Sequence, residues 1–504
     1  MYITQMDLIK QRLSAEHSPS NEEIIADLIR RDASSSAKRD MAEGTRYYLG
    51  DHDVLRRDFT RSIVYERPDG SDTDRELEFR NRNRSNQHDV NRFHTLLVNQ
   101  KVGYVVGKEP SFDAGGDKIL QEAVSSRTDE VFCDTLTDYI IGTANKGEEW
   151  LHFYRAKNGE LRYCITPAEG IIAIYDDEHQ DELVELIRYY TYTIISGNRE
   201  VHRYKAEWWT AETVTYYIQD EDERFRLDTD HPYNPAPHWW SVTSVDGVER
   251  TRERQSWGRV PFIPLRNNSA CQTDLQPIKG LIDAYDLISS MGTNDVLDLV
   301  GFYFLISGYG GEAASAIIKR LQVNRAANVN SSDGALTAHQ VNLSAEERLN
   351  WMTMLRRDIF RFGMGFDVDL ESVGNATNVA LNLQYGLLDL KSDALIRKLK
   401  RALKEWCWFV VEDYNRLHGT ALDAGKITIT INKSRITNEK ELVDMVVAAY
   451  NAGILPEKIA LEQLPLVVDA DAAMKLLEKE KADAAKRQRD MFRAGDYKAL
   501  GDDE

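Results

Sequence analysis

The feature that most constrains this fold is a stretch of uninterrupted helical pattern over about 376–418. It contains no proline and one interior glycine, Gly386. At 1.5 Å per residue, a helix of this length would extend about 60 Å, twice the diameter of a small domain. A helix that long is usually structural. We therefore expect it to belong to a bundle, a coiled coil or an assembly.

Helical pattern also surrounds this stretch. Apolar residues at helical spacing predict a helix over about 275–300, with Asp283 and Asp298 on the side opposite the apolar stripe. A capping box from Ser344 to Glu347 opens a further helix, AEERLNWMTMLRRDIFRF.

Two segments interrupt these helices. The segment 301–342 is mixed and holds two strand-like pieces. The 16-residue loop 363–378 exceeds the usual helix–helix connection of roughly 2–8 residues, which is typical of a functional or disordered segment. A short strand, KITITI, and a helical C-terminal region complete this half of the chain.

The N-terminal half begins with helices. A capping box from Ser20 to Glu23 opens the first one, and ASSSAK (33–38) reads as a flexible joint. A second helix is expected over about 88–106 with Asp89 as its cap, and more helix over about 117–145.

The pattern then changes to period two. From about 148 to 228 the chain alternates and is rich in Tyr, Trp, Ile, Val and Thr, and Asn158-Gly159 marks a hairpin. The sequence thus predicts a mainly α fold with an α+β part that contains a long helix and an antiparallel sheet.

Composition narrows the class of protein. The chain has 504 residues, 63 basic and 82 acidic, for a net charge of −19. This excess of negative charge argues against an ordinary high-affinity DNA binder, because such binding needs cations that displace counterions from phosphates. No apolar run approaches the roughly 18 residues of a membrane span, so we expect no membrane partner.

Motifs of enzymes and metal sites are missing. The chain has no GxxxxGK[ST], HExxH, GxSxG or GxGxxG, so we expect no catalytic residues and no cofactor. His88 and His94 share a predicted helix but lie about 240° apart around its axis, which prevents chelation of one metal ion. Asp228, Asp230 and His231 are too few for a hard-cation site, and we expect no bound metal.

A basic stripe is the most specific charge pattern. It recurs at helical spacing on the long helix and comprises Arg397, Lys400, Arg401 and Lys404. Two readings stay open: a solvated face or one that forms ion pairs with a neighbouring chain, and a phosphate-facing stripe. The nearby Trp406, Trp408 and Phe409 are expected to pack in the core rather than stack on bases.

Several segments, taken in order, resemble the portal proteins of tailed bacteriophages, most closely those of Bacillus-infecting siphophages. They include NRNRSNQHDVNRFHTLLVNQKVGYVVGKEPSF (81–112), WGRVPFIPLRNN (257–268), LLDLKSDALIRKLKRALKEWCWFVVEDY (387–414) and SRITNEKELVD (434–444). The resemblance runs from about 40 to 470.

The resemblance implies a portal-like fold of wing, stem, clip and crown. Carried over, its parts are an N-terminal helix and linker at 1–40, a wing at 41–265, stem helices at 266–300 and 343–362, a clip at 301–342, a tunnel loop at 363–378, a long wing helix and strand at 379–433, and a crown and tail at 434–504. The implied tunnel-loop residues are Phe366, Asp367, Asp369, Glu371, Asn375 and Asn378.

The resemblance also implies a function and partners. Portal proteins form a ring, typically of twelve subunits, with thirteen an alternative for the isolated protein. The ring sits at one capsid vertex of the virion, is made in the host cytoplasm, and conducts double-stranded DNA. Implied partners are the terminase large subunit, head-completion or adaptor proteins, and the major capsid and scaffolding proteins.

The net charge agrees with such a conduit. Twelve copies would carry twelve times −19, or −228, and a wall that repels phosphates holds DNA weakly. We therefore expect a mainly acidic tunnel with Asp283 and Asp298 as wall residues. Two other functions remain as alternatives: a carboxylate-based hydrolase, and a DNA-binding factor that uses the basic stripe.

Overall fold

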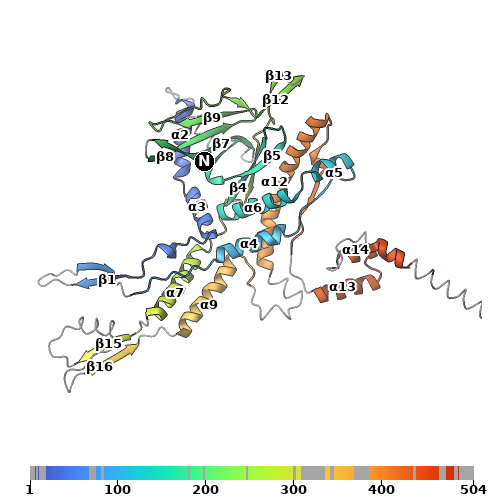
Figure 1. The fold of residues 1–504 in the computed structure, drawn as a ribbon. Helices are drawn as coiled ribbons and strands as arrows, with labels where there is room; N and C mark the ends of the chain where they lie inside the picture. The colour runs from blue at the N-terminus through green and yellow to red at the C-terminus, as the bar shows by residue number, and fades with distance from the viewer. Residues whose placement is uncertain are drawn as a thin grey trace, which may run out of the picture. The chain divides into compact units, whose positions relative to one another are not determined.

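The structure is a computed structural model, and it describes most of the chain (Figure 1). The described residues are 6, 9–10, 19–66, 75–80, 84–179, 182–196, 199–245, 248–298, 302–307, 335–340, 345–367, 385–434, 439–464, 473–481 and 486. The chain divides into two compact units, of which the larger comprises Met1–Asp367 with Leu387–Ser434 and the smaller Val368–Gly386 with Arg435–Glu504.

Two helices open the larger unit. Helix α2 spans Asn21–Ala33, and the predicted capping box is confirmed: the Ser20 hydroxyl accepts from the amide of Glu23, whose carboxylate accepts from the amide of Ser20. The flexible joint predicted at 33–38 is wrong. Only two residues separate α2 from helix α3 (Ser36–Tyr48), because the Ser35 side chain caps α3.

Three more helices follow: α4 (Phe93–Val106), α5 (Lys118–Ser125) and α6 (Glu130–Lys146). The start predicted for the first is wrong, because Asp89 lies before α4 and does not cap it. The helix predicted over 117–145 is two helices, since Asp117 caps α5 and Asp129 caps α6. Gly147 caps the C-terminal end of helix α6, and its φ of +85° suits glycine.

Antiparallel sheet covers the predicted alternating region. Strands β4 (Glu148–Arg155) and β5 (Leu161–Thr166) form the hairpin expected at Asn158-Gly159, and β14 (Phe262–Arg266) completes this three-stranded sheet. The larger sheet has the order β10-β9-β8-β7-β6, with β11 paired to β9. Its strands are β6 (Ile171–Tyr175), β7 (Leu183–Ser196), β8 (Arg199–Trp209), β9 (Thr213–Gln219), β10 (Phe225–Leu227) and β11 (Ala236–Pro237).

Apolar side chains of α2 cover one side of this larger sheet. Ile24, Ile25 and Leu28 are buried with Ile187 and Tyr217 in one cluster. The apolar face of these alternating strands is therefore covered by an amphipathic helix, as the apolar face of a half-buried sheet requires.

Four antiparallel pairs complete the strands. They are β1 (Arg61–Glu66) with β2 (Arg75–Arg80), β3 (Ser111–Asp113) with β17 (Thr428–Thr430), β12 (Trp239–Val245) with β13 (Val248–Gln255), and β15 (Phe302–Ser307) with β16 (Ala335–Gln340). The last pair confirms the two strand-like pieces expected within 301–342, and β17 confirms the strand at KITITI.

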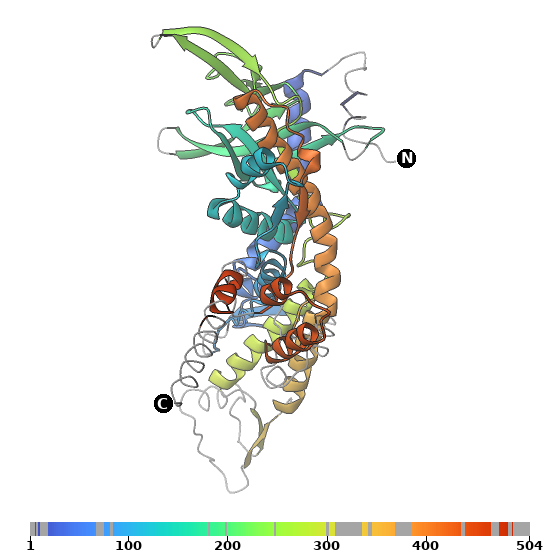
Figure 2. The same ribbon diagram turned by 90° about the vertical axis from the view of Figure 1, so that its right-hand side faces the viewer.

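Helices α7 (Lys279–Asp298) and α9 (Ala345–Phe362) form an antiparallel pair (Figure 1, Figure 2). Their inner ends pack together through Ile282, Ile359 and Phe360 in one buried cluster, and Arg348 reaches Asp295 at 2.8 Å nearer the other end. Outer apolar side chains stay exposed, with Val296 at 74% and Trp351 at 56%.

The long helix α12 spans Gly386–His418, so its described length is about 50 Å. Gly386 is therefore its first residue and not an interior one, and the predicted start near 376 lies outside the described residues. One face of α12 is buried in the main core, where Trp406 and Phe409 pack as expected.

The smaller unit contains α13 (Glu439–Asn451) and α14 (Glu457–Glu462), with Pro456 as the N-cap residue of α14. The described chain is thus a mixture of helices and antiparallel sheet, as the sequence predicted. None of its described helices is long and apolar enough to cross a membrane.

Candidate functional site

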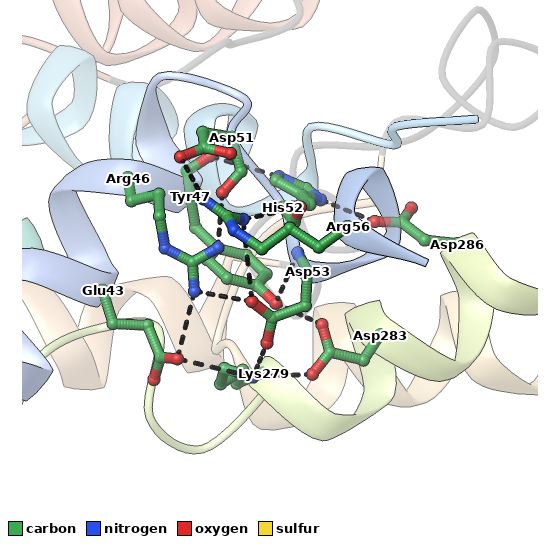
Figure 3. Close-up of polar contacts among 10 residues, drawn as sticks. All are labelled: Glu43, Arg46, Tyr47, Asp51, His52, Asp53, Arg56, Lys279, Asp283 and Asp286. Atoms are coloured by element: carbon green, nitrogen blue, oxygen red, sulfur yellow. Dashed lines mark hydrogen bonds and ion pairs between the residues drawn. The ribbon is translucent and has the colours of Figure 1, made fainter. Parts of the chain in front are cut away.

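Asp283, a predicted tunnel-wall residue, lies in an ion-pair network at the first turns of α7. The Tyr47 hydroxyl donates to one Asp283 oxygen, and Lys279 Nζ lies 2.8 Å from the other (Figure 3). Lys279 Nζ also lies 2.7 Å from Asp53, in the 3₁₀ turn η1 (Asp53–Arg56), and Arg46 lies 2.7 Å from the same carboxylate. Within one chain, therefore, this network joins α7 to α3 and to η1.

The charges of this network stabilise one another. Partial burial would raise the pKa of Asp53, but hydrogen bonds from Lys279 and Arg46 outweigh it and lower that pKa to about 2. Burial would lower the pKa of Lys279, yet Asp283 and Asp53 raise it. Burial and the bond to Asp283 raise the pKa of Tyr47. At neutral pH, Asp53 and Lys279 are thus charged and Tyr47 is a neutral donor.

A buried pair lies one turn further along α7. His52 and Asp286 are both fully buried, and Nδ1 of His52 contacts the Asp286 carboxylate (Figure 3). The other ring nitrogen, Nε2, faces the Tyr47 carbonyl oxygen at 3.2 Å, and the Tyr47 ring stacks on the imidazole with centroids 4.4 Å apart. Because both groups are fully buried, removing either one leaves the other without its hydrogen-bond partner, which costs more than breaking one of the partly exposed pairs beside it.

Polar side chains of α7 also hold the irregular segment 86–91. Three α7 residues at i, i+4 and i+8 accept from every second amide of this segment: Asp286 from Asn91 at 2.8 Å, Ser290 from Asp89 at 2.9 Å, and Asn294 from Gln87 at 2.8 Å. Four helical residues advance about 6.0 Å and two extended residues about 6.6 Å, so the two repeats stay in register. We call this set of contacts the α7 ladder.

Asp89 strengthens the α7 ladder from the other side. Its carboxylate accepts hydrogen bonds from the hydroxyls of Ser289, at 2.8 Å, and Thr293, at 2.6 Å. Asp89, which was expected to cap a helix, therefore holds the segment 86–91 against α7. His88, predicted on the same helix as His94, lies in this segment before α4 begins.

A second buried cluster joins α4 to α12. Lys101 Nζ lies 3.1 Å from Asp274 and also donates to Asn267, and Lys391 of α12 lies 3.0 Å from Asp274. Burial lowers the pKa of Lys101 to about 8 against the opposing effect of Asp274. Burial would raise the pKa of Asp274, but Lys101 and Lys391 together hold it well below its usual range.

The first residues of the predicted tunnel loop are held against α4. Gln100 accepts from the Phe366 amide at 3.1 Å and donates to its carbonyl oxygen at 2.6 Å, and the Phe366 side chain is buried. Asp367 pairs with Arg356 at 2.7 Å. A Cβ added at Gly365 would lie 2.0 Å from Leu97, so glycine permits this close approach.

The other predicted tunnel-loop residues follow Asp367 in the chain. Asp369, Glu371, Asn375 and Asn378 lie outside the described residues, as does the side chain of Asp298 at the end of α7.

The predicted basic stripe lies on the outer face of α12. Arg397, Arg401 and Lys404 are exposed and Lys400 is half-buried, whereas Leu395, Leu399 and Leu403 on the opposite side are buried.

The residues considered as metal ligands, and the buried His94, form ion pairs, hydrogen bonds and ring contacts within the chain. Asp228 is buried and pairs with Lys205 at 3.0 Å, and Asp230 donates its amide to Asp228. His231 stacks on Tyr216. His94 is buried and bonds Asn145, and burial lowers its pKa to about 4. In the part of the chain that the structure describes, no group of three His, Cys, Asp or Glu could hold a metal ion.

Sequence reasoning missed His52, Asp286, Lys101 and Asp274. Nothing local singles out the lysine or the histidine, because their partners are remote in sequence. The α7 ladder did leave a signal: Asp286, Ser290 and Asn294 are polar residues at a spacing of four on one helix face.

Comparisons with known proteins give a consistent match. The family described as "Phage portal protein, SPP1 Gp6-like" matches residues 31–487. The portal protein of Bacillus phage SPP1 is 28% identical over 451 residues, covering 89% of this chain and 85% of that protein. The portal protein of Clostridium phage phiCD119 is 26% identical over 475 residues, covering 90% and 95% respectively.

A solved structure was also found, titled "Neck of empty GTA particle computed with C6 symmetry". One of its chains is 13% identical, covers 74% of this chain and 90% of that chain, and has a TM-score of 0.39. This likeness is too low to inform the fold.

Replacing Asp286 tests the α7 ladder. Asp286→Ala leaves His52 and the Asn91 amide without their acceptor, and it should lower the free energy of unfolding by about 3–5 kcal/mol. The amides of Gln87, Asp89 and Asn91 should exchange hydrogen faster, as mass spectrometry would show. Asp295→Ala is the control, because its partner Arg348 is partly exposed and the loss should be about 0–1 kcal/mol. Unchanged exchange over 86–91 would contradict the ladder.

Acid stability tests the Asp274 cluster. Because the pKa of Asp274 is lower in the folded state, the unfolded chain binds more protons between the two pKa values, and stability falls as pH drops below the unfolded value of about 4. Asp274→Asn should be less stable than the unmodified protein at pH 7. The gap in melting temperature should shrink between pH 4 and pH 2. A gap that stays constant over this range would show that the cluster does not act through the charge of Asp274.

Proposed function

Because the chain belongs to the SPP1 Gp6-like family of phage portal proteins, we propose that its copies form a ring at one capsid vertex, through which double-stranded DNA is packaged and ejected. The observation that carries this proposal is the family match over residues 31–487. Portal proteins form oligomeric rings in phage capsids, and the family is structural rather than enzymatic. The chain is thus a portal protein and a head-to-tail connector component of the virion.

We propose the following division of the chain. The N-terminal helix and linker are 1–40, the wing comprises 41–265 together with 379–433, the stem 266–300 and 343–362, the clip 301–342, the tunnel loop 363–378, and the crown and C-terminal tail 434–504. On this division α7 and α9 are stem helices and the β15–β16 pair belongs to the clip. Support comes from the antiparallel packing of α7 on α9 and from their exposed apolar residues, which neighbouring copies would cover.

The proposed ring has a mainly acidic tunnel. Support comes from the net charge of −19 per copy, since a conduit must hold DNA weakly. Of the two wall residues, Asp298 is the better candidate, because Asp283 is already paired with Lys279 and Tyr47. The tunnel-loop residues, Phe366, Asp367, Asp369, Glu371, Asn375 and Asn378, remain part of this proposal.

We further propose twelve subunits in the virion, with thirteen as the alternative for the isolated protein. The sequence contains no GxxxxGK[ST], which supports a partner as the source of energy. The terminase large subunit fits that role. Head-completion or adaptor proteins would bind the ring after packaging. The major capsid and scaffolding proteins would surround the ring, and synthesis would take place in the host cytoplasm.

Mass photometry and negative-stain electron microscopy of the purified full chain test the ring. We expect annular particles of about twelve or thirteen times the 57.7 kDa chain. A protein that stays monomeric at every concentration, and that forms no annulus within phage particles, would overturn the proposal.

Charge reversal tests the acidic tunnel. Phage that carry Asp298→Lys should package or eject DNA more slowly while the ring stays intact, because a ring of lysines attracts phosphates. DNA per particle and ejection in vitro are the measurements. Glu212→Lys is the control, since it makes the same charge change in the exposed turn between β8 and β9. DNA transit that matches the control would remove Asp298 from the tunnel wall.

A further inference from the structure

The outer face of α12 is charged, and two of its cations have no anionic partner among the described residues. Arg397 and Lys404 are exposed, and neither forms an ion pair with any residue that the structure describes. They lie opposite Leu399 and Trp406, which are buried in the main core. Leu390, 63% exposed, extends the same face toward the start of the helix.

Helix α6 carries the opposite charge on its own outer face. Glu130, Asp134 and Asp138 recur every four residues and are exposed, and none of them pairs with a cation among the described side chains. Val131 beside them is 65% exposed. The inner face of α6 is buried in the main core.

The two faces are similar in length and opposite in charge. The basic positions from Arg397 to Lys404 span about 10 Å of helix, and the acidic positions from Glu130 to Asp138 span about 12 Å. Each face combines charged residues with an exposed apolar side chain, Leu390 on α12 and Val131 on α6, which a protein partner could cover.

Within one chain these faces cannot meet. The inner faces of α6 and α12 pack on each other through Phe132 and Trp406, whose ring centroids lie 4.8 Å apart, so their outer faces point away from each other. In Figure 2, α6 lies to the left of the long orange helix α12. A surface on one side of a subunit that complements the opposite side is what a head-to-tail contact needs, and such contacts close into rings.

We infer that the basic face of α12 in one copy binds the acidic face of α6 in the next copy around the ring. This inference rests on the proposed function, because it names the surface by which the ring's subunits associate. The occupant is a second copy and not DNA, since the complementary charge is present on the chain itself and its net charge is strongly negative.

Two charge-reversal variants of the full chain test the inference. The first is Arg397→Glu with Lys404→Glu, and the second is Asp134→Lys with Asp138→Lys. Glu130 stays unchanged because it lies in the first turn of α6, where a negative charge favours the helix.

The control is Lys157→Glu with Arg226→Glu, which changes the net charge as the first variant does at exposed sites elsewhere. Ring formation is measured by mass photometry at several salt concentrations, and folding by circular dichroism and melting temperature.

Each reversed variant alone should lose most of its rings, because like charges then face each other at every contact. An equal mixture of the two should regain rings, since alternating copies restore opposite charges at every contact. These rings should contain even numbers of subunits and both variants. The control should assemble as the unmodified protein does.

Other outcomes would overturn the inference. Rings that form normally from either variant alone, or a loss that mixing does not restore, would show that these faces do not meet. The first variant could also form normal rings and lose salt-sensitive binding of duplex DNA. That result would show that the basic stripe binds nucleic acid and not a second copy. If a variant fails to fold, Arg397→Ala with Lys404→Ala replaces it, and rings as salt-resistant as the control's would then refute the contact. Absence of rings in the unmodified protein would instead refute the proposed function itself.

Discussion

Burial of one face of α12 organises the larger unit of this protein. Leu395, Leu399, Trp406 and Phe409 lie in one core with α6 and the three-stranded sheet, so segments far apart in sequence share one apolar surface. Burying each of these side chains contributes about 1.5–3 kcal/mol. Because that face is fully used within the chain, the opposite face is left to solvent or to a partner. The charged outer surface of α12 is thus a consequence of how its core is built.

Polar contacts have a different role at α7. A helix pair such as α7 and α9 cannot cover all its apolar side chains, and Val296 and Trp351 stay exposed. What fixes α7 to the rest of the unit is the buried His52–Asp286 pair and the α7 ladder, which satisfy amides of the segment 86–91. Buried polar groups need such partners, so these contacts hold the segment 86–91 against α7.

Local periodicity explains most of the fold that the sequence predicted. The hairpin at Asn158-Gly159, the helix that Ser20 opens and the strands of the larger sheet depend on neighbours in sequence, and all were found. Predictions failed where a polar side chain could form either of two sets of hydrogen bonds. Asp89 could cap a helix or accept from Ser289 and Thr293, and the ladder on α7 decided between them. The capping of α3 by Ser35, where a flexible joint was expected, is a similar case.

The sequence by itself determined the helices and strands, the excess of negative charge and the resemblance to portal proteins. Residue spacing depends only on neighbours in the chain, and net charge is a sum over all residues, so neither requires knowledge of the fold. Only the tertiary structure decided which ionisable groups meet. His52 reaches Asp286 across 234 residues of chain, and the Asp283 carboxylate lies against Lys279 and Tyr47. Periodicity can assign a residue to a face of its helix, but the packing of other elements against that face determines which charges become neighbours.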